Sequence, residues 1–301
     1  MNPSQFHFVR RVAVVLFVLT GGSLVPCGLT GQTTLAPAQG SAASSAQMPA
    51  EAQAQLDKLQ DALKATLAGD ETTEARELNK IGELYYRTSN YENALEYYNR
   101  ALIPARSAKD AEQEAAALSG IGSCYRDQGQ SQKALANYQQ ALDLATSSGD
   151  ERGQAAALYG IGSVDFNLGQ NQKALEIHDR ALALARKVGD SDLEATILCN
   201  EGLANAVLGK IQIAQDDYNK ALPIIRQIGD RDSEARTLNN LRILHEGRGE
   251  MQNARECYNQ AVRIFRDVGD RFNEAWALTN IGNVDKARGD TREALSITKA
   301  R

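Results

Sequence analysis

Apolar residues recur along most of this 301-residue chain with the spacing of a buried helix face. In one segment Ala115, Leu118, Gly122 and Tyr125 follow one another at i, i+3, i+7 and i+10, which places them on one side of an α-helix. A turn at Gly129 then separates this helix from a second one that also carries small and apolar residues. The pattern predicts two helices joined by a turn.

The same segment recurs every 40 residues, from about Asp70 to the C-terminus. A Gly-Asp step marks most boundaries, because glycine suits the left-handed turn that ends a helix and aspartate is a strong N-cap. The opening aspartates are Asp110, Asp150, Asp190, Asp230 and Asp270. One such unit cannot bury its own apolar face, whereas stacked units can. We therefore expect an all-α solenoid of about six units over residues 70–301, the last of them incomplete.

The repeated residues resemble the signature of the tetratricopeptide repeat family, in the 40-residue variety typical of kinesin light chains. In the second unit they are Leu118, Ile121, Gly122, Tyr125, Gly129, Ala134, Tyr138, Ala141 and Leu142. The resemblance implies a right-handed superhelical solenoid of antiparallel helix pairs. It also implies a protein-interaction scaffold without intrinsic catalysis, whose first helices line a concave groove.

The N-terminal residues 1–31 read as a targeting segment. Arg10 and Arg11 precede an apolar run, Val12–Val25, that is too short to cross a bilayer comfortably. This is the layout of a secretory signal peptide, and we expect an exported protein, periplasmic or extracellular. Residues 32–48 contain almost no large apolar residue and should form a flexible linker. Residues 49–69 carry leucines at helical spacing and should form a helix that caps the first repeat.

Two alternatives for the N-terminus stay open. The segment around Cys27 partly resembles a bacterial lipoprotein box, although Pro26 stands where that box has a small residue. The apolar run could also be retained as an anchor. The sequence therefore predicts membrane contact only if the N-terminal segment is retained or Cys27 is lipidated.

Composition narrows the chemistry further. The formal net charge is −5, which provides no basic surface for nucleic acid. The four cysteines are far apart and lack zinc-type spacing. No glycine-rich phosphate loop or metal motif is present in the sequence. We expect a non-enzyme without a cofactor, and a protein or peptide as its partner.

Candidate partner-binding residues are found by angle around the first helix of each unit. The arc opposite the buried stripe holds the positions of Ala116, Ser119, Gly120, Ser123, Arg126 and Asp127. In the family this arc lines the concave groove. Carried through the units, it gives as partner-binding candidates Asn79, Tyr159, Phe166, Asn200, Leu203, Arg236, Asn240, Trp276, Asn280 and Asn283.

Asn200, Asn240 and Asn280 occur once per unit and could form a ladder of amides along an extended peptide backbone. Trp276 and Tyr159 would be aromatic anchors, since aromatic side chains dominate binding hot spots. The alternative is that these asparagines bridge neighbouring helices or face water.

Four units, the third to the sixth, carry a polar residue where the family has an aromatic one, and in the sixth unit this residue is Asp285. Asp165 and His178 should face each other within the third unit and resemble part of a catalytic triad, but the favoured interpretation is a hydrogen-bonded pair in the core. Asn205 and His245 should offer hydrogen bonds to Tyr218 and Tyr258.

The last unit stops at Arg301, before its second helix is complete. Exported bacterial proteins with this repeat resemble the front portion of chains that carry a caspase-like protease domain. The alternative to a free scaffold is therefore the sensor or regulatory arm of a larger effector.

Overall fold

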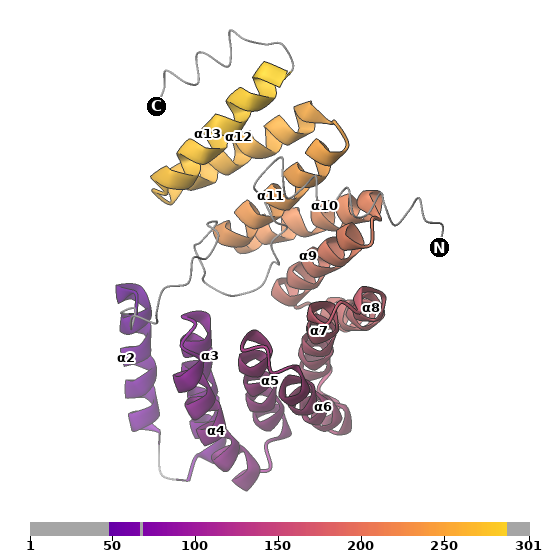
Figure 1. Ribbon diagram of the computed structural model, residues 1–301. Coiled ribbons are helices and arrows are strands. Elements are labelled where there is room, and N and C mark those ends of the chain that lie inside the picture. Colours follow the sequence, from indigo (N-terminus) through magenta and orange to yellow (C-terminus); the bar gives the residue numbers. More distant parts are fainter. Residues whose placement is uncertain (1–47, 67–68, 288–301) are drawn as a thin grey trace. The chain divides into compact units, whose positions relative to one another are not determined.

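The computed structural model describes residues 48–66 and 69–287. Every regular element within these ranges is an α-helix, so the all-α prediction is confirmed (Figure 1). The helices are α2 Ala50–Ala65, α3 Glu71–Arg87, α4 Tyr91–Ser107, α5 Ala111–Asp127, α6 Ser131–Ser148, α7 Glu151–Asn167, α8 Asn171–Val188, α9 Ser191–Val207, α10 Ile211–Ile228, α11 Arg231–Gly247, α12 Met251–Asp267 and α13 Arg271–Ala287. The predicted signal segment, Cys27, almost all of the linker and the second helix of the sixth unit lie outside the described residues.

The 40-residue period of the sequence is kept by the helices. The first helices of the six units, α3, α5, α7, α9, α11 and α13, start at Glu71, Ala111, Glu151, Ser191, Arg231 and Arg271. Each of the first five is followed by a second helix of 17 or 18 residues. The prediction of a solenoid built from helix pairs is therefore confirmed.

The boundaries form as the Gly-Asp steps predict. The carboxylate of Asp110 accepts the backbone N–H of Gln113 at 3.0 Å, and that of Asp150 accepts the N–H of Gly153 at 3.0 Å. Gly149 precedes Asp150 with a φ of 75°, in the left-handed region where glycine is unstrained. Each boundary thus ends one helix and starts the next within two residues.

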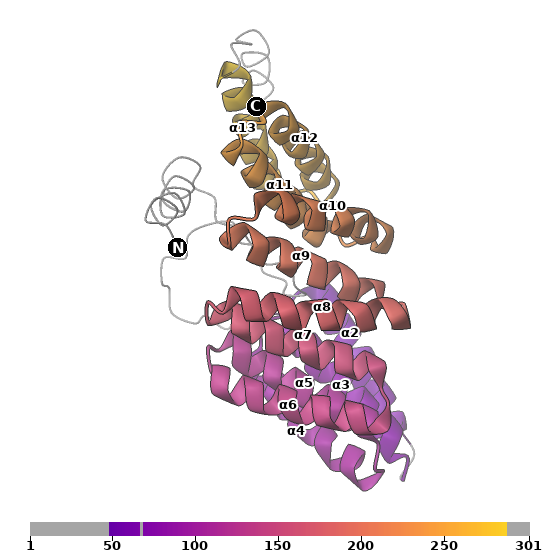
Figure 2. The same ribbon diagram turned by 90° about the vertical axis from the view of Figure 1, so that its right-hand side faces the viewer.

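The helices group into two compact units, which are described separately. The N-terminal unit contains α2 to α8 and ends at Asp190, and the C-terminal unit starts at Ser191 and contains α9 to α13. In the N-terminal unit α3 contacts α5 and α5 contacts α7, whereas α4 does not contact α6 and α6 does not contact α8. Figure 2 shows these helices from the side of α8. The first helices therefore form the inner layer of this unit and the second helices the outer layer.

Close packing of the layers depends on glycine beside tyrosine. Tyr138 of α6 is 1% exposed, and its ring lies against the backbone of Gly122 and Gly160 on α5 and α7. A Cβ atom at Gly160 would lie 2.2 Å from the tyrosine ring. Tyr98 of α4 packs in the same way between Gly82 and Gly120. These glycines let a large ring fill the space between neighbouring pairs.

Helix α2 lies beside the first pair, at the position where the sequence predicts a capping helix. Leu56 is buried and packs with Ile81 and Leu84 of α3, and Leu59 and Leu63 cover the same cluster. The helix ends at Ala65, four residues before the predicted limit.

Candidate functional site: the inner faces of the two units

The inner face of each unit is defined here by the first-helix positions equivalent to Ala116, Ser119, Gly120, Ser123, Arg126 and Asp127. In the N-terminal unit a polar network ties these positions together. Arg126 Nη2 donates to the Tyr86 hydroxyl at 2.7 Å, and that hydroxyl donates to Asp127 Oδ2 at 2.8 Å. Arg126 Nε donates to Asp127 Oδ1 at 2.8 Å. Burial raises the pKa of Tyr86, so its hydroxyl stays a donor at neutral pH.

Two predicted partner-binding residues, the expected anchor Tyr159 and Phe166, lie on α7 and are partly exposed. The Tyr159 ring stacks on the His178 imidazole, with the ring centroids 5.7 Å apart. Because its neighbour is fully buried, the Tyr159 ring has little freedom to turn. A partly exposed ring in a fixed orientation offers contact area at low entropic cost.

Asn79, another predicted binding residue, is buried. Its Nδ2 donates to the backbone carbonyl of Gln113 at 3.0 Å and to Gln113 Oε1 at 3.2 Å. The amide therefore bridges α3 and α5, which corresponds to the helix-bridging alternative, and it offers no exposed group to a partner.

The asparagine ladder of the C-terminal unit is uneven. Asn240 is 0% exposed, whereas Asn200 and Asn280 are half-buried and Asn283 is exposed. Asn280 Nδ2 donates to the carbonyl of Trp276 in its own helix at 2.9 Å. A peptide could reach Asn200, Asn280 and Asn283, but burial closes Asn240 to direct contact.

The remaining predicted residues of this unit divide in the same way. Leu203 is 4% exposed and belongs to the core, while Arg236 and Trp276 are half-buried. The positions of Leu203 and Asn240 around their helices did not predict that these residues are buried. Angular position alone does not show how deeply the neighbouring helix pair covers each helix.

Arg242 is a residue that the sequence reasoning missed. It is 1% exposed, and its Nη1 donates to Glu246 Oε2 at 2.7 Å and to the Tyr258 hydroxyl at 3.1 Å. The guanidinium also lies 5.5 Å from the ring centroid of Trp276. It thereby links α11, α12 and α13 and fixes the tryptophan. The sequence does contain a signal that marks Arg242 as unusual. The equivalent position of every other unit holds a glycine, namely Gly82, Gly122, Gly162, Gly202 and Gly282.

The expected hydrogen-bonded pair of Asp165 and His178 does not form. Asp165 Oδ1 accepts from Lys173 Nζ at 3.0 Å, while Asp165 Oδ2 has no hydrogen-bond partner among the described residues. Burial lowers the pKa of His178 to about 4, so the ring is neutral at pH 7. The triad-like interpretation loses the carboxylate–imidazole contact on which it depends.

The other expected polar pairs are also wrong. Asn205 donates to Asp217 Oδ2 at 2.9 Å rather than to Tyr218. His245 Nδ1 bonds Glu250 Oε2 at 2.6 Å, and the Tyr258 hydroxyl donates to Glu246 at 3.0 Å instead. Nearby carboxylates supplied stronger, charge-assisted partners than the aligned repeat positions suggested.

The described residues offer little for other chemistry. No group of three or more His, Cys, Asp or Glu side chains in residues 48–66 and 69–287 could hold a metal ion. Burial raises the pKa of the Cys124 and Cys257 thiols to about 12, so neither is a thiolate at neutral pH. None of the helices in these ranges is both long and apolar enough to cross a bilayer.

Comparison with known sequences gives one family. The sequence model described as tetratricopeptide repeat matches residues 73–147, 153–227, 195–267 and 233–298. A search of curated protein sequences found no match.

Similar folds occur among solved structures. BtubC from P. vanneervenii has a TM-score of 0.59 and 18% identity, over 73% of this chain and 93% of that one. A signal transduction ATPase with a tetratricopeptide repeat sensor, from Pyrococcus horikoshii, has a TM-score of 0.62 and 17% identity. The match covers 83% of this chain and 38% of the ATPase. A Rap protein complexed with competence and sporulation factor has a TM-score of 0.60 and 15% identity. The match covers 82% of this chain and 78% of the Rap protein. At these identities the likeness concerns the fold alone.

Proposed function

The chain belongs to the tetratricopeptide repeat family, and from that premise we propose that it is a scaffold whose inner faces bind an extended segment of a partner protein. One observation carries the proposal. Tyr159, Phe166 and Trp276 are apolar rings on inner-face positions, and all three remain partly exposed. Aromatic rings of this kind dominate protein-binding hot spots.

Polar groups near these rings would fix the backbone of the bound segment. Arg236, Asn200, Asn280 and Asn283 keep part of their side chains at the surface, and amide groups can both donate to and accept from a peptide. Asn79, Leu203 and Asn240 would act indirectly, by holding the first helices in place. The similar Rap protein was solved in complex with competence and sporulation factor, which agrees with a binding role for this fold.

The test compares inner and outer substitutions. Phe166→Ala with Asn283→Ala removes two inner-face side chains, one from each unit. The matched control is Ile103→Ala with Phe272→Ala, since these side chains are 72% and 73% exposed and lie off the inner-face positions. A partner captured by the natural chain and by the control, but at least about tenfold less by the inner-face variant, supports the proposal. Equal capture by both variants contradicts it.

A second candidate function is the sensor or regulatory arm of a larger effector, such as one with a caspase-like protease domain. The observation that favours it is the similar signal transduction ATPase, in which a tetratricopeptide repeat sensor occurs and of which this chain covers 38%. Reading the gene past Arg301 tests it: a further domain in frame supports this candidate, and an immediate stop codon contradicts it.

Export is a separate proposal that rests on the sequence of residues 1–31, where Arg10 and Arg11 precede an apolar run. Mass spectrometry of the mature N-terminus tests it. Loss of the first 25–40 residues supports a cleaved signal, and an intact Met1 contradicts cleavage.

A further inference from the structure

A tyrosine of the outer layer extends to the inner face of the N-terminal unit. The ring of Tyr98 starts from α4, lies beside the backbone of Gly82 on α3, and ends against Gly120 on α5. Gly120 is one of the inner-face positions, and a Cβ atom there would lie 2.3 Å from the ring carbon that carries the hydroxyl. Glycine therefore leaves a gap through which the Tyr98 hydroxyl reaches the inner face.

Tyr138 repeats this arrangement 40 residues later in the sequence. Its ring lies beside Gly122 on α5 and ends against Gly160 on α7. Its hydroxyl lies 2.9 Å from Ser123 Oγ, at another inner-face position. In the C-terminal unit the positions equivalent to Gly160 hold asparagines, namely Asn200, Asn240 and Asn280. The two gaps are thus a feature of the N-terminal unit.

The hydroxyl of Tyr98 is not used within the fold. The residue is 5% exposed, and its hydroxyl forms no hydrogen bond with the residues of the described ranges. Burial raises the pKa of Tyr98, and the inner-face carboxylate of Glu83 raises it further, so the hydroxyl keeps its proton at neutral pH. A nearly buried O–H group without a partner in the fold is suited to an acceptor on a ligand.

Neighbouring inner-face groups also have protons left to donate. The pair of Ser123 and Tyr138 contains two O–H groups, and only one of them serves the bond between the two residues. Arg126 uses its Nε for Asp127 and its Nη2 for Tyr86, which leaves Nη1 without a partner among the described residues. Both carboxylate oxygens of Asp127 already accept hydrogen bonds. The site is therefore rich in donors.

The charges around these donors favour a neutral ligand. Asp127 already pairs with Arg126 at 2.8 Å, and the exposed carboxylate of Glu83 adds a negative charge beside Tyr98. An anion would be repelled there. Carbonyl oxygens accept hydrogen bonds without bringing a charge, and a proline-rich backbone presents carbonyls without N–H groups. A backbone of this kind matches a site that offers mainly donors.

The spacing of the two hydroxyls fits a polyproline II chain. Tyr98 and Tyr138 take equivalent positions against the neighbouring helices α5 and α7, and packed helices lie roughly 8–10 Å apart. A polyproline II chain repeats every three residues, over about 9 Å, whereas an extended strand repeats every two residues, over about 7 Å. Tyr159 and Phe166 on α7 are half-buried and supply aromatic walls of the kind that proline-rich segments contact.

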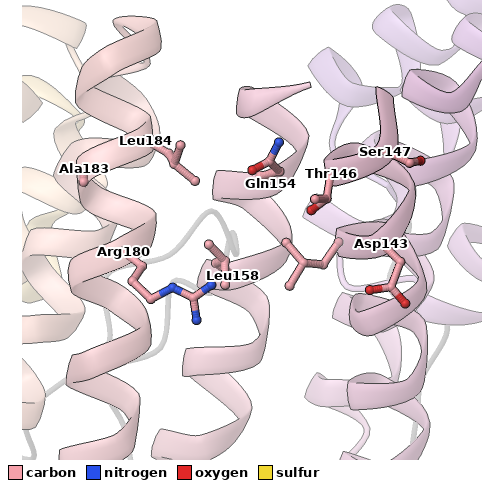
Figure 3. A pocket seen from close by; sticks show the side chains of 9 residues that line it. Asp143, Thr146, Ser147, Gln154, Leu158, Arg180, Ala183 and Leu184 are labelled. Atoms are coloured by element: carbon pink, nitrogen blue, oxygen red, sulfur yellow. The ribbon is translucent and has the colours of Figure 1, made fainter. Parts of the chain in front are cut away.

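The outer layers, in contrast, carry hollows that arise from the repeat itself. One of about 650 Å³ lies between α6, α7 and α8, where Asp143 and Arg180 both line it (Figure 3). An equivalent hollow of about 700 Å³ lies between α10, α11 and α12 and is also lined by groups of both charges. Hollows that recur with both charges do not single out one ligand.

We propose that the inner face of the N-terminal unit binds a proline-rich segment of a partner protein in the polyproline II conformation. The hydroxyl of Tyr98 and the pair of Ser123 and Tyr138 donate to backbone carbonyls three residues apart. The rings of Tyr159 and Phe166 contact the proline rings. This inference rests on the proposed scaffold function and names the kind of segment that this inner face accepts.

The test titrates acetyl-hexaproline-amide into the full chain, up to millimolar concentration, while the ring signals of ¹³C-labelled tyrosine are recorded by NMR. Saturable shifts at Tyr98 and Tyr138 support the proposal. A flexible peptide of the same length, acetyl-(Gly-Ser)₃-amide, should bind at least about tenfold more weakly, because it lacks the preformed conformation. No saturable shift with hexaproline, or equal affinity for the two peptides, overturns the proposal.

Tyr98→Phe removes the hydroxyl and keeps the ring. It should weaken hexaproline binding about fivefold, while the free energy of unfolding in urea stays that of the natural chain. The matched control is Tyr97→Phe on the same helix, whose ring stacks on Tyr85 in the cluster covered by α2. It should bind hexaproline as the natural chain does. Unchanged binding in Tyr98→Phe, or an equal loss in Tyr97→Phe, contradicts the assignment.

The titration and the partner-capture experiment can fail separately. If hexaproline does not bind, but Phe166→Ala with Asn283→Ala still loses the partner, the proline-rich inference is wrong and the scaffold function stands. If hexaproline binds and Tyr98→Phe weakens it, but that inner-face variant captures the partner normally, the peptide site stands and the scaffold function is contradicted.

Discussion

Lys109 takes a backbone conformation that glycine takes at the equivalent positions of later repeats. Its φ is 56°, whereas Gly149 and Gly229 have φ values of 75° and 83°. A left-handed conformation costs a residue with a Cβ atom roughly 1 kcal/mol. Lys109→Gly should therefore raise the free energy of unfolding by up to about 1 kcal/mol, as measured by urea denaturation. The control Lys109→Ala keeps the strain, and an equal gain in that control would contradict the explanation.

His178 should make the free energy of unfolding depend on pH. Burial lowers its pKa to about 4 in the folded chain, below the value of about 6.5 expected when unfolded. The folded state thus binds fewer protons, so the free energy of unfolding should fall as the pH drops from about 7 to about 4 and this contribution should level off below that. The loss should not exceed roughly 3 to 4 kcal/mol.

The matched variant for this prediction is His178→Phe, which places an apolar ring where the first two repeats have Tyr98 and Tyr138. Urea denaturation across this pH range should show a smaller slope for the variant. Identical slopes for the two proteins would mean that another group causes the acid sensitivity.

At the scale of the helix, close contact between neighbouring helix pairs depends on glycines, which have no side chain. A methyl group at Gly160 would lie 2.2 Å from the ring of Tyr138, and the tyrosine hydroxyl is held at 2.9 Å from Ser123 Oγ. Gly160→Ala should therefore destabilise the chain by about 2 kcal/mol, although alanine is the better helix former.

Gly247 provides the control, because a Cβ atom there meets no other atom within 4 Å. Gly247→Ala should leave stability unchanged or raise it by up to about 1 kcal/mol in the same denaturation experiment. If both alanine variants gain stability, α7 can shift away from Tyr138 and the packing argument fails.

Helix boundaries could be predicted because they depend on local chemistry. Asp110 and Gly149 act on their own turn of backbone, so their roles follow from residue type and spacing. The inner-face residues were harder, because burial of Asn240 and Leu203 depends on how neighbouring helices cover them. The contacts of Arg242 depend on three helices at once. A comparison of the repeats, position by position, does identify Arg242 as unusual, because it stands where the other repeats have a glycine.

For the whole molecule, a stack of repeats should transmit disturbance mainly to nearest neighbours. Gly160→Ala disturbs the contact between α6 and α7 in the N-terminal unit. Hydrogen exchange measured by mass spectrometry should accelerate in α6, α7 and the adjoining helices, while α12 keeps its natural rate. Uniform acceleration along the chain would show that all repeats unfold as one cooperative block instead.

Site-specific photo-crosslinking shows whether the inner face binds a partner polypeptide. A photoreactive phenylalanine analogue would replace Phe166 or Trp276 on the inner face, or Ile103 on α4, which is 72% exposed and off the inner-face positions. Partner adducts should form at Phe166 and Trp276 and not at Ile103. Adducts at Ile103 with none at either inner position would contradict binding at the inner face.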